Sequence, residues 1–154
     1  MGTFAIAVQS YLRDVLTDRR RSYDWETEYA IAGTPVDIAG VTSGELAVVE
    51  LEWRRADPAN NTAKLFRHLA EGALDVDQIA VFQIFTGYYD LASGGVSSKR
   101  ANAEFVGRVA AETVDSLAYH PIEFELDPPK RGADRPEGWK AVADTTARQI
   151  AARL

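Results

Sequence analysis

Hydrophobic residues recur along the chain with two different spacings, and these spacings predict helices that alternate with strands. Apolar positions three and four residues apart predict four helices, over residues 4–20, 59–73, 99–117 and 139–153. Apolar runs rich in β-branched and aromatic residues predict five strands, over residues 25–32, 36–41, 46–53, 78–86 and 120–126. The expected order is therefore helix, three strands, helix, strand, helix, strand, helix.

Short turn signals join the first three predicted strands into a meander. Gly33-Thr34-Pro35 separates the first two strands, and Thr42-Ser43-Gly44 separates the second from the third. The strands over residues 46–53 and 78–86 are apolar almost throughout, which is typical of central strands covered on both faces. A meander followed by crossover helices predicts an α/β fold, with a mixed central sheet flanked by helices.

Two of the predicted helices carry a stripe that we expect to face the core. In the helix over residues 99–117 the stripe consists of Phe105, Val106, Val109, Ala110, Thr113 and Leu117. In the helix over residues 59–73 it consists of Thr62, Leu65, Phe66, Leu69 and Ala73.

Length and composition are those of one ordinary globular domain. The 154 residues, 46% hydrophobic and 26% charged, suffice for one core, so we expect a single domain over residues 1–154. No apolar run is long enough to span a membrane and the N-terminal stretch lacks a signal-peptide pattern, so we expect a cytoplasmic protein without a membrane partner. The absence of cysteine excludes disulfides, zinc–thiolate sites and thiol nucleophiles. The net charge of −6 argues against a protein that coats nucleic acid, but it is compatible with a metal-dependent nuclease.

Two acids, Glu50 and Glu52, end the third predicted strand on a face that would otherwise be core. Side chains two residues apart on a strand point the same way, so the two carboxylates lie on one face. Burying carboxylates side by side costs several kcal/mol per ion unless a cation lies between them. A divalent metal is the simplest such cation, and Asp37 on the preceding strand is placed to supply a further oxygen ligand.

These acids and the order of elements resemble the PD-(D/E)XK nuclease superfamily, which has the restriction-endonuclease-like fold. The matching motifs are Pro35-Val36-Asp37 on the second strand and Glu50-Leu51-Glu52 at the end of the third. The resemblance covers about residues 4–126 in topology but only these few positions in motif. It implies an αβββαβ core, extended here by a C-terminal strand and helix.

The resemblance implies a metal-dependent endonuclease that hydrolyses phosphodiester bonds in DNA. Asp37, Glu50 and the backbone carbonyl of Leu51 would bind Mg²⁺, with Mn²⁺ as a substitute, because hard cations prefer oxygen ligands. The metal would polarise the phosphate and lower the pKa of the attacking water. Members of the family often carry another glutamate near the first helix, and Glu26 and Glu28 are the nearest candidates here.

One position departs from the family pattern, because Glu52 stands where a lysine is usual. Glu52 would then be a second metal ligand or the base that orients the water. Lys64, on the following helix, is the candidate replacement that would neutralise charge in the transition state, and Arg67 is a spare cation. The helical wheel places Lys64 nearly opposite the core stripe, so it serves only if the rim of its helix faces the acids.

Further residues around the acids are candidates for binding DNA. Arg54, Arg55, Asn61 and Arg67 lie on or beside the elements that carry the acids, where they would contact flanking phosphates. The aromatic residues that would stack on bases, unless they pack in the core or an interface, are Trp25, Tyr88 and Tyr89.

Other interpretations remain open. If the third strand lay at a sheet edge, Glu50 and Glu52 would form a solvated face, as we expect for Glu123 and Glu125. The missing lysine would also suit a catalytically inactive nuclease fold that binds DNA or protein, and a third interpretation is an unrelated α/β interaction protein. The small size and the lack of a separate DNA-reading domain favour a homodimer or dependence on a partner, with the loop Gly87–Ser98 or the last helix as the interface.

Overall fold

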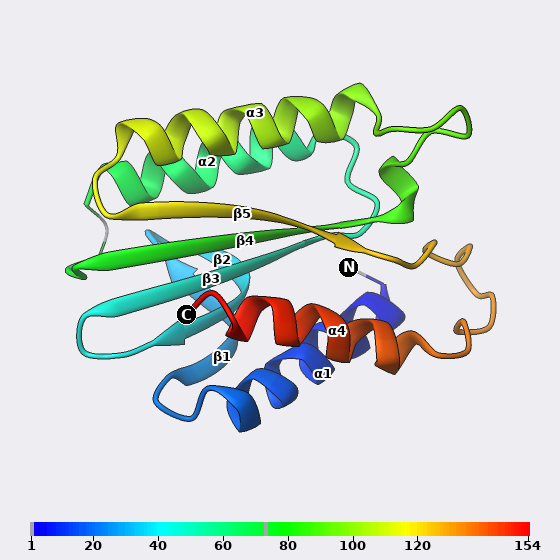
Figure 1. The fold of residues 1–154 in the computed structure, drawn as a ribbon, viewed down its shortest axis with the longest axis horizontal. Coiled ribbons are helices and arrows are strands. Elements are labelled where there is room, and N and C mark those ends of the chain that lie inside the picture. Colours follow the sequence, from blue (N-terminus) through cyan, green and yellow to red (C-terminus); the bar gives the residue numbers. More distant parts are fainter. Residues whose placement is uncertain (1, 73) are drawn as a thin grey trace.

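In a computed structural model that describes residues 2–72 and 74–154, a five-stranded sheet lies between two layers of helices (Figure 1). The elements in chain order are α1 (Thr3–Arg19), β1 (Asp24–Ile31), β2 (Thr34–Val41), β3 (Glu45–Glu52), α2 (Pro58–Ala70), β4 (Gln78–Thr86), the 3₁₀ turn η1 (Gly87–Tyr89), α3 (Ser98–Thr113), β5 (Leu117–Phe124) and α4 (Trp139–Ala151). The predicted α/β class, the mixed sheet and the order of helices and strands are thereby confirmed.

The strands lie in the sheet in the same order as in the chain, from β1 to β5. β1, β2 and β3 pair antiparallel, as a meander requires, whereas β4 and β5 each pair parallel to the strand before them. Parallel neighbours need a crossover, and α2 and α3 supply the two crossovers. β3 lies at the centre of the sheet, so the acids at its end do not lie on an edge strand.

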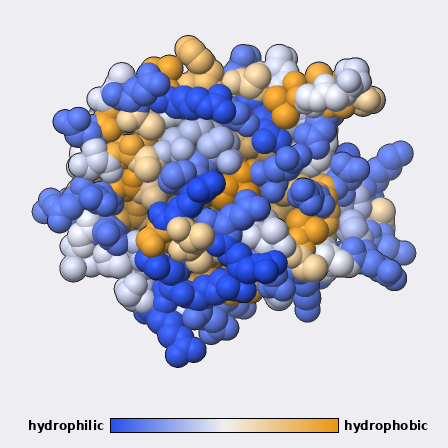
Figure 2. All heavy atoms as spheres, in the orientation of Figure 1, coloured by the Kyte–Doolittle hydropathy of each residue, from blue (hydrophilic) through white to orange (hydrophobic). Residues whose placement is uncertain are grey.

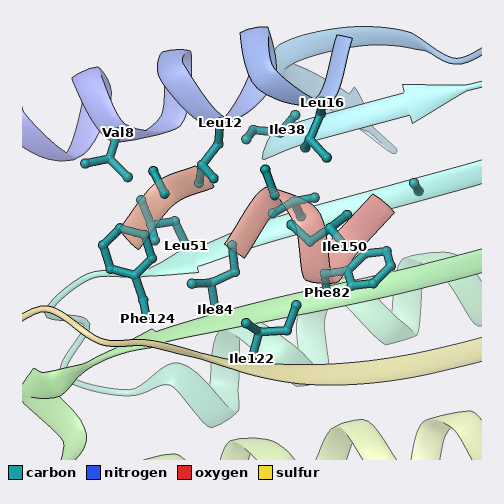
Figure 3. Close-up of a cluster of buried hydrophobic side chains, with 14 of the residues drawn as sticks. Val8, Leu12, Leu16, Ile38, Leu51, Phe82, Ile84, Ile122, Phe124 and Ile150 are labelled. Carbon is teal, nitrogen blue, oxygen red and sulfur yellow. The ribbon is translucent and has the colours of Figure 1, made fainter. Parts of the chain in front are cut away.

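The larger part of the core lies between the sheet and α1 with α4. Figure 3 shows Val8, Leu12 and Leu16 of α1 pointing toward strand residues such as Leu51 and Ile84. All five side chains are almost fully buried. Burial of each such side chain contributes about 1.5–3 kcal/mol, so this layer fixes α1 and α4 on their face of the sheet.

The opposite face of the sheet is covered by α2 and α3 (Figure 1). The predicted stripe of α2 is confirmed for Thr62, Leu65, Phe66 and Leu69, which are all buried. The helix ends at Ala70, three residues before the predicted end, and residue 73 lies outside the described residues.

The predicted stripe of α3 is wrong in part. Phe105 is 66% exposed and Val109 is 40% exposed, whereas the buried residues of this helix include Ala103 and Gly107. Gly107 lies directly against the ring of Tyr119, so close that a Cβ atom would overlap with the ring. The small residues let α3 approach the sheet closely, and this packing overrides the hydrophobic pattern that the sequence displays.

The end of α3 and the start of β5 also differ from the prediction. The helix ends at Thr113, and Leu117 already pairs with Ile79 at the start of β5. Ser116 between them adopts a left-handed φ of 63°, which a helix does not continue. The apolar Leu117 therefore belongs to the strand, although its spacing fits the helical stripe.

Hydrophobic residues on the face of the molecule in Figure 2 occur as small areas between hydrophilic ones. Within residues 2–72 and 74–154, no helix is both long enough and apolar enough to cross a membrane.

The contact between Gly107 and Tyr119 predicts a large effect of a small substitution. We expect Gly107→Val to lower the free energy of unfolding by about 1–3 kcal/mol, because the new side chain must displace the Tyr119 ring. The control is Ala101→Val, at an exposed position of the same helix, which we expect to change it by no more than about 0.5 kcal/mol. Urea unfolding measures both, and equal effects of the two substitutions would contradict the close packing of α3.

Candidate metal and nucleic-acid site

The two acids Asp37 and Glu50 face each other on neighbouring strands, and both are buried. The pairing of β2 with β3 ends at Ile38 and Val49, and one step further along the register brings Asp37 opposite Glu50. Seven of the eight residues of β3 are buried, because the strand lies between two others and under helices on both faces. The fold thus forces carboxylates into a position that usually holds apolar side chains.

Asp37 takes over a backbone interaction where the two strands stop pairing. Its Oδ2 accepts a hydrogen bond of 2.7 Å from the backbone N–H of Leu51. A buried amide without a partner costs about 1–3 kcal/mol, so this hydrogen bond stabilises the gap between the strands. It also fixes one oxygen of Asp37 next to the backbone of the Glu50-Leu51-Glu52 motif.

The carboxyl groups of Asp37 and Glu50 lie within hydrogen-bonding reach of each other. Burial, and then the negative charges of Asp37 and Glu52, raise the pKa of Glu50 well above its usual value. Burial also raises the pKa of Asp37, although the hydrogen bond from the Leu51 amide opposes this. The raised pKa of Glu50 favours its protonated form, and a proton held there would relieve the repulsion between the two groups.

β1 and β2 change face next to Asp37. Trp25 and Ile38 pack on the α1 side of the sheet, whereas Ile31 and Val36 pack on the α2 side. The switch occurs at Glu28, which lies opposite Asp37 in the register and has a left-handed φ of 54°. A non-glycine residue in this conformation costs about 1–3 kcal/mol and is found preferentially near functional sites.

Gln9 of α1 forms hydrogen bonds to both Glu28 and Asp37, where the two strands change face. Its Nε2 donates to the Glu28 carboxylate at 2.8 Å and to the backbone carbonyl of Asp37 at 2.6 Å. Of the two acids considered as a fourth carboxylate, Glu28 is therefore tied to the site through Gln9. Glu26 is exposed and pairs with Ala39, away from the end of the strand pairing.

Glu52 is fully buried, and its carboxylate is surrounded by donors. Gln83 of β4 donates to Oε1 at 2.9 Å, Asn61 of α2 donates to Oε1 at 3.2 Å, and the Arg55 guanidinium donates to Oε2 at 3.0 Å. Both oxygens are thus engaged by the protein itself. In this structure Glu52 orients its neighbours, rather than lying open to water.

The contacts of Glu52 extend into a buried polar network that joins β3 to β4, α2 and β5. Gln83 also donates to the Thr62 hydroxyl at 2.7 Å and accepts a hydrogen bond of 2.6 Å from the Tyr119 hydroxyl. The Thr62 hydroxyl in turn donates to the carbonyl of Pro58 at 2.8 Å. A buried network in which every member has a partner is rigid, so α2 and β5 are fixed relative to the end of β3.

Arg55 is the cation that the structure brings next to the acids. It forms an ion pair with Glu52, and its charge also acts on Asp37 and Glu50, where it lowers the pKa. Its backbone carbonyl accepts a hydrogen bond of 3.0 Å from the Tyr89 hydroxyl, which holds the turn after β3. Predicted as a phosphate contact, Arg55 therefore also has a structural role.

Lys64 lies at the mouth of a narrow pocket that reaches Glu50. Together with Asn61 and His68 of the same helix, it lines a cavity of about 10 Å³, which is near the lower limit for one water molecule. The rim of α2 therefore borders Glu50, whereas neither Asp37 nor Glu52 lines this pocket. Arg67 is also exposed on α2, but it is not among the described residues that line this pocket.

The aromatic candidates separate clearly by burial. Trp25 and Tyr89 are core residues, whereas Tyr88 is exposed at the end of β4. Arg54 is also exposed, and its guanidinium lies over the Tyr88 ring at 5.4 Å from the ring centre.

The residues present fit a cation with few protein ligands. In residues 2–72 and 74–154, no three His, Cys, Asp or Glu side chains are grouped so that they could hold a metal ion. Two carboxylates, Asp37 and Glu50, do lie together, and the structure shows no ion pair to either among the described residues. Mg²⁺ commonly binds through one or two carboxylates, so the oxygen donors of this pair suit it, although the cavity of about 10 Å³ beside Glu50 holds no more than about one of the water molecules that Mg²⁺ retains.

Gln9, Gln83 and Tyr119 support the acids, although none of them is among the residues predicted for the site. Each is a polar residue inside an otherwise apolar helix or strand, and such a residue must find a buried partner. That signal marks the residues as members of a buried network, but it does not identify the partner.

Comparisons with protein-family models, with curated proteins and with solved structures give no match to this chain.

The raised pKa of Glu50 predicts how stability depends on pH when divalent metal is removed with EDTA. Below the pKa of Glu50 in the unfolded chain, near 4.5, this residue is protonated in both the folded and the unfolded state, so it does not lower the free energy of unfolding. As the pH rises from that value to the raised pKa of the folded state, the free energy of unfolding falls, because the unfolded chain ionises where the buried group still holds its proton. Glu50→Gln cannot ionise, so we expect it to gain stability relative to the wild type between pH 4 and pH 8.

Urea unfolding in EDTA over this pH range measures the effect. The matched control is Glu125→Gln, at an exposed acid, for which the difference from the wild type should stay constant with pH. If the difference in the free energy of unfolding between Glu50→Gln and the wild type were also constant with pH, ionisation of Glu50 would not oppose folding.

Proposed function

We propose that the chain is a metal-dependent endonuclease that hydrolyses phosphodiester bonds in DNA, and that its fold is of the restriction-endonuclease-like kind. The observation that carries the proposal is the pair Asp37 and Glu50, two buried carboxylates face to face on neighbouring strands without an ion-pair partner among the described residues. Such a pair lowers the stability of the protein unless it binds a cation. The motif resemblance and the order of elements support the same function.

In this proposal Asp37 and Glu50 hold Mg²⁺ or Mn²⁺, and the carbonyl of Leu51 adds a third oxygen. The bound metal supplies Lewis-acid polarisation of the phosphate and a water of lowered pKa. Asp37 is kept in place by the Leu51 amide and by Gln9 at its own carbonyl. These contacts reduce the reorganisation needed when a substrate arrives.

The remaining site residues either position other side chains or neutralise charge on the phosphate. Glu52 is a positioning residue, because its carboxylate orients Arg55 and Asn61 through hydrogen bonds. Lys64, at the mouth of the pocket beside Glu50, neutralises the charge that develops on the phosphate. Arg54 and Arg67 follow the acids in the chain, and both are exposed. In this proposal they contact the flanking phosphates. A homodimer would bring two such sites to the two strands of a duplex.

Metal binding predicts a thermal shift that depends on the acids. If 10 mM Mn²⁺ is about 100 times its dissociation constant, it raises the melting temperature of the wild type by about 5–10 °C. We expect no such shift for Asp37→Asn or Glu50→Gln, because each removes one carboxylate ligand. Glu125→Gln, at an exposed acid directly after β5 and two residues from Glu123, should behave as the wild type does.

Cleavage of a plasmid or a labelled oligonucleotide in Mn²⁺ tests activity itself. We expect Glu50→Gln to reduce the rate by about 100-fold or more, since loss of a metal ligand removes several kcal/mol of transition-state stabilisation. We expect Lys64→Ala to reduce the rate without abolishing the thermal shift, whereas Arg67→Ala should have a smaller effect. Equal rates of the wild type and Glu50→Gln, at the level of a blank, would overturn the proposal.

The alternative is a nuclease fold without catalysis that binds DNA or a protein. It is favoured by the engagement of Glu52, which occupies the usual lysine position and has no free oxygen. A thermal shift with Mn²⁺ and no cleavage of any tested DNA would indicate this alternative.

A further inference from the structure

Tyr88, in the turn η1 directly after β4, lies exposed beside two cations. Its side chain is 40% exposed, although η1, the turn that carries it, joins a buried strand to a loop. The Arg54 guanidinium lies 5.4 Å and the Lys99 ammonium 5.7 Å from the centre of its ring. An aromatic face flanked by positive charge is the arrangement that proteins use to stack a nucleic-acid base while they hold its phosphates.

Tyr88, Arg54 and Lys99 form an aromatic and cationic platform, and buried Tyr89 supports it from the interior of the protein. The ring of Tyr89 meets the ring of Tyr88 edge to face, with centres 5.1 Å apart. Tyr89 is itself fully buried, packs on Phe85 and donates its hydroxyl to the carbonyl of Arg55. Tyr88 is therefore presented on an anchored turn, which lowers the entropy that a bound ligand must overcome.

The two cations beside Tyr88 contact its ring but are not paired with an acid among the described residues. Arg100, the next residue after Lys99, forms ion pairs with Asp90 and Glu104. Among the described residues, neither Arg54 nor Lys99 has an ion pair. Lys99 also lies in the first turn of α3, which contains no acid, although the positive end of a helix disfavours a cation. A bound anion would relieve this unfavourable charge.

The platform adjoins the acids through the backbone. Arg54 precedes Arg55, which pairs with Glu52, and the Thr86 hydroxyl bonds the carbonyl of Trp53 at 2.6 Å. The ends of β3 and β4 are thus tied together, one carrying the acids and the other carrying Tyr88.

We propose that Tyr88, Arg54 and Lys99 bind an unpaired segment of DNA, with one base stacked on the Tyr88 ring and the adjacent phosphates on the two cations. In a duplex the faces of the bases are covered by their neighbours, so this contact selects single-stranded DNA or a single-stranded end. As the substrate class of the site it rests on the proposed function, but the binding can be measured without cleavage.

Fluorescence anisotropy in EDTA tests the proposal, with a fluorescein-labelled 20-nucleotide thymidine strand and a duplex of equal length as probes. We expect the wild type to bind the single strand at least about 10-fold more tightly than the duplex. Tyr88→Ala should weaken single-strand binding by about 5- to 100-fold, the range that stacking of one base provides. Tyr88→Phe keeps the ring and should bind like the wild type.

The control for a lost exposed aromatic is Phe105→Ala, on the outer face of α3, which should leave binding unchanged. Arg54→Ala and Lys99→Ala should each lower the slope of log affinity against log salt by about 0.7, as expected for one phosphate contact on a single strand. Circular dichroism checks that every variant folds.

Three results would overturn the proposal: no binding of the single strand by the wild type, equal binding of single strand and duplex, or unchanged binding by Tyr88→Ala. Failure of the proposed function would look different. If Glu50→Gln and the wild type are equally inert but single-strand binding depends on Tyr88 as expected, the nuclease proposal fails and the platform stands. If the protein cuts duplex DNA and Tyr88→Ala has no effect, the platform fails and the nuclease proposal stands.

Discussion

The burial of Asp37 opposite Glu50 is the constraint around which the end of the sheet is organised. Two carboxylates in a dry environment repel each other and lose hydration, and together these effects cost several kcal/mol. The surrounding structure offsets only part of this cost. The Leu51 amide donates to Asp37, while Arg55 acts on both acids from its ion pair with Glu52. What remains is a strained pair that gains stability by binding either a proton or a metal ion.

The supporting residues follow from that constraint. Gln9 fixes the backbone of Asp37 at the point where β1 and β2 change face, and Glu28 accepts its second hydrogen bond. Glu52 holds Arg55 close, and through Gln83 it is tied to the adjacent strand. A site in which the acids, their cation and the neighbouring turn are fixed in advance suits electrostatic catalysis, because little must move when charge develops.

The sequence predicted the order of helices and strands and the shared face of Glu50 and Glu52, since both depend on local patterns. Apolar runs bounded by turn residues determined β3 and β4, and the i, i+2 spacing placed Glu50 and Glu52 on one face. Which face of α3 is buried was not predictable. It depends on how closely Gly107 approaches Tyr119, and this is a tertiary contact. The same holds for the site: only the folded chain shows that Glu52 has three hydrogen-bonding partners, or that Gln9 reaches Asp37 from a helix 28 residues away in the chain.

The most direct test of the metal site is a crystal structure of the protein soaked in Mn²⁺, with the anomalous signal locating the metal. The proposal predicts one peak within about 2.0–2.6 Å of an oxygen of Asp37 and an oxygen of Glu50, with water completing the coordination. A structure at millimolar Mn²⁺ without a peak between these two carboxylates, and with Glu50 still within hydrogen-bonding reach of Asp37, would contradict it.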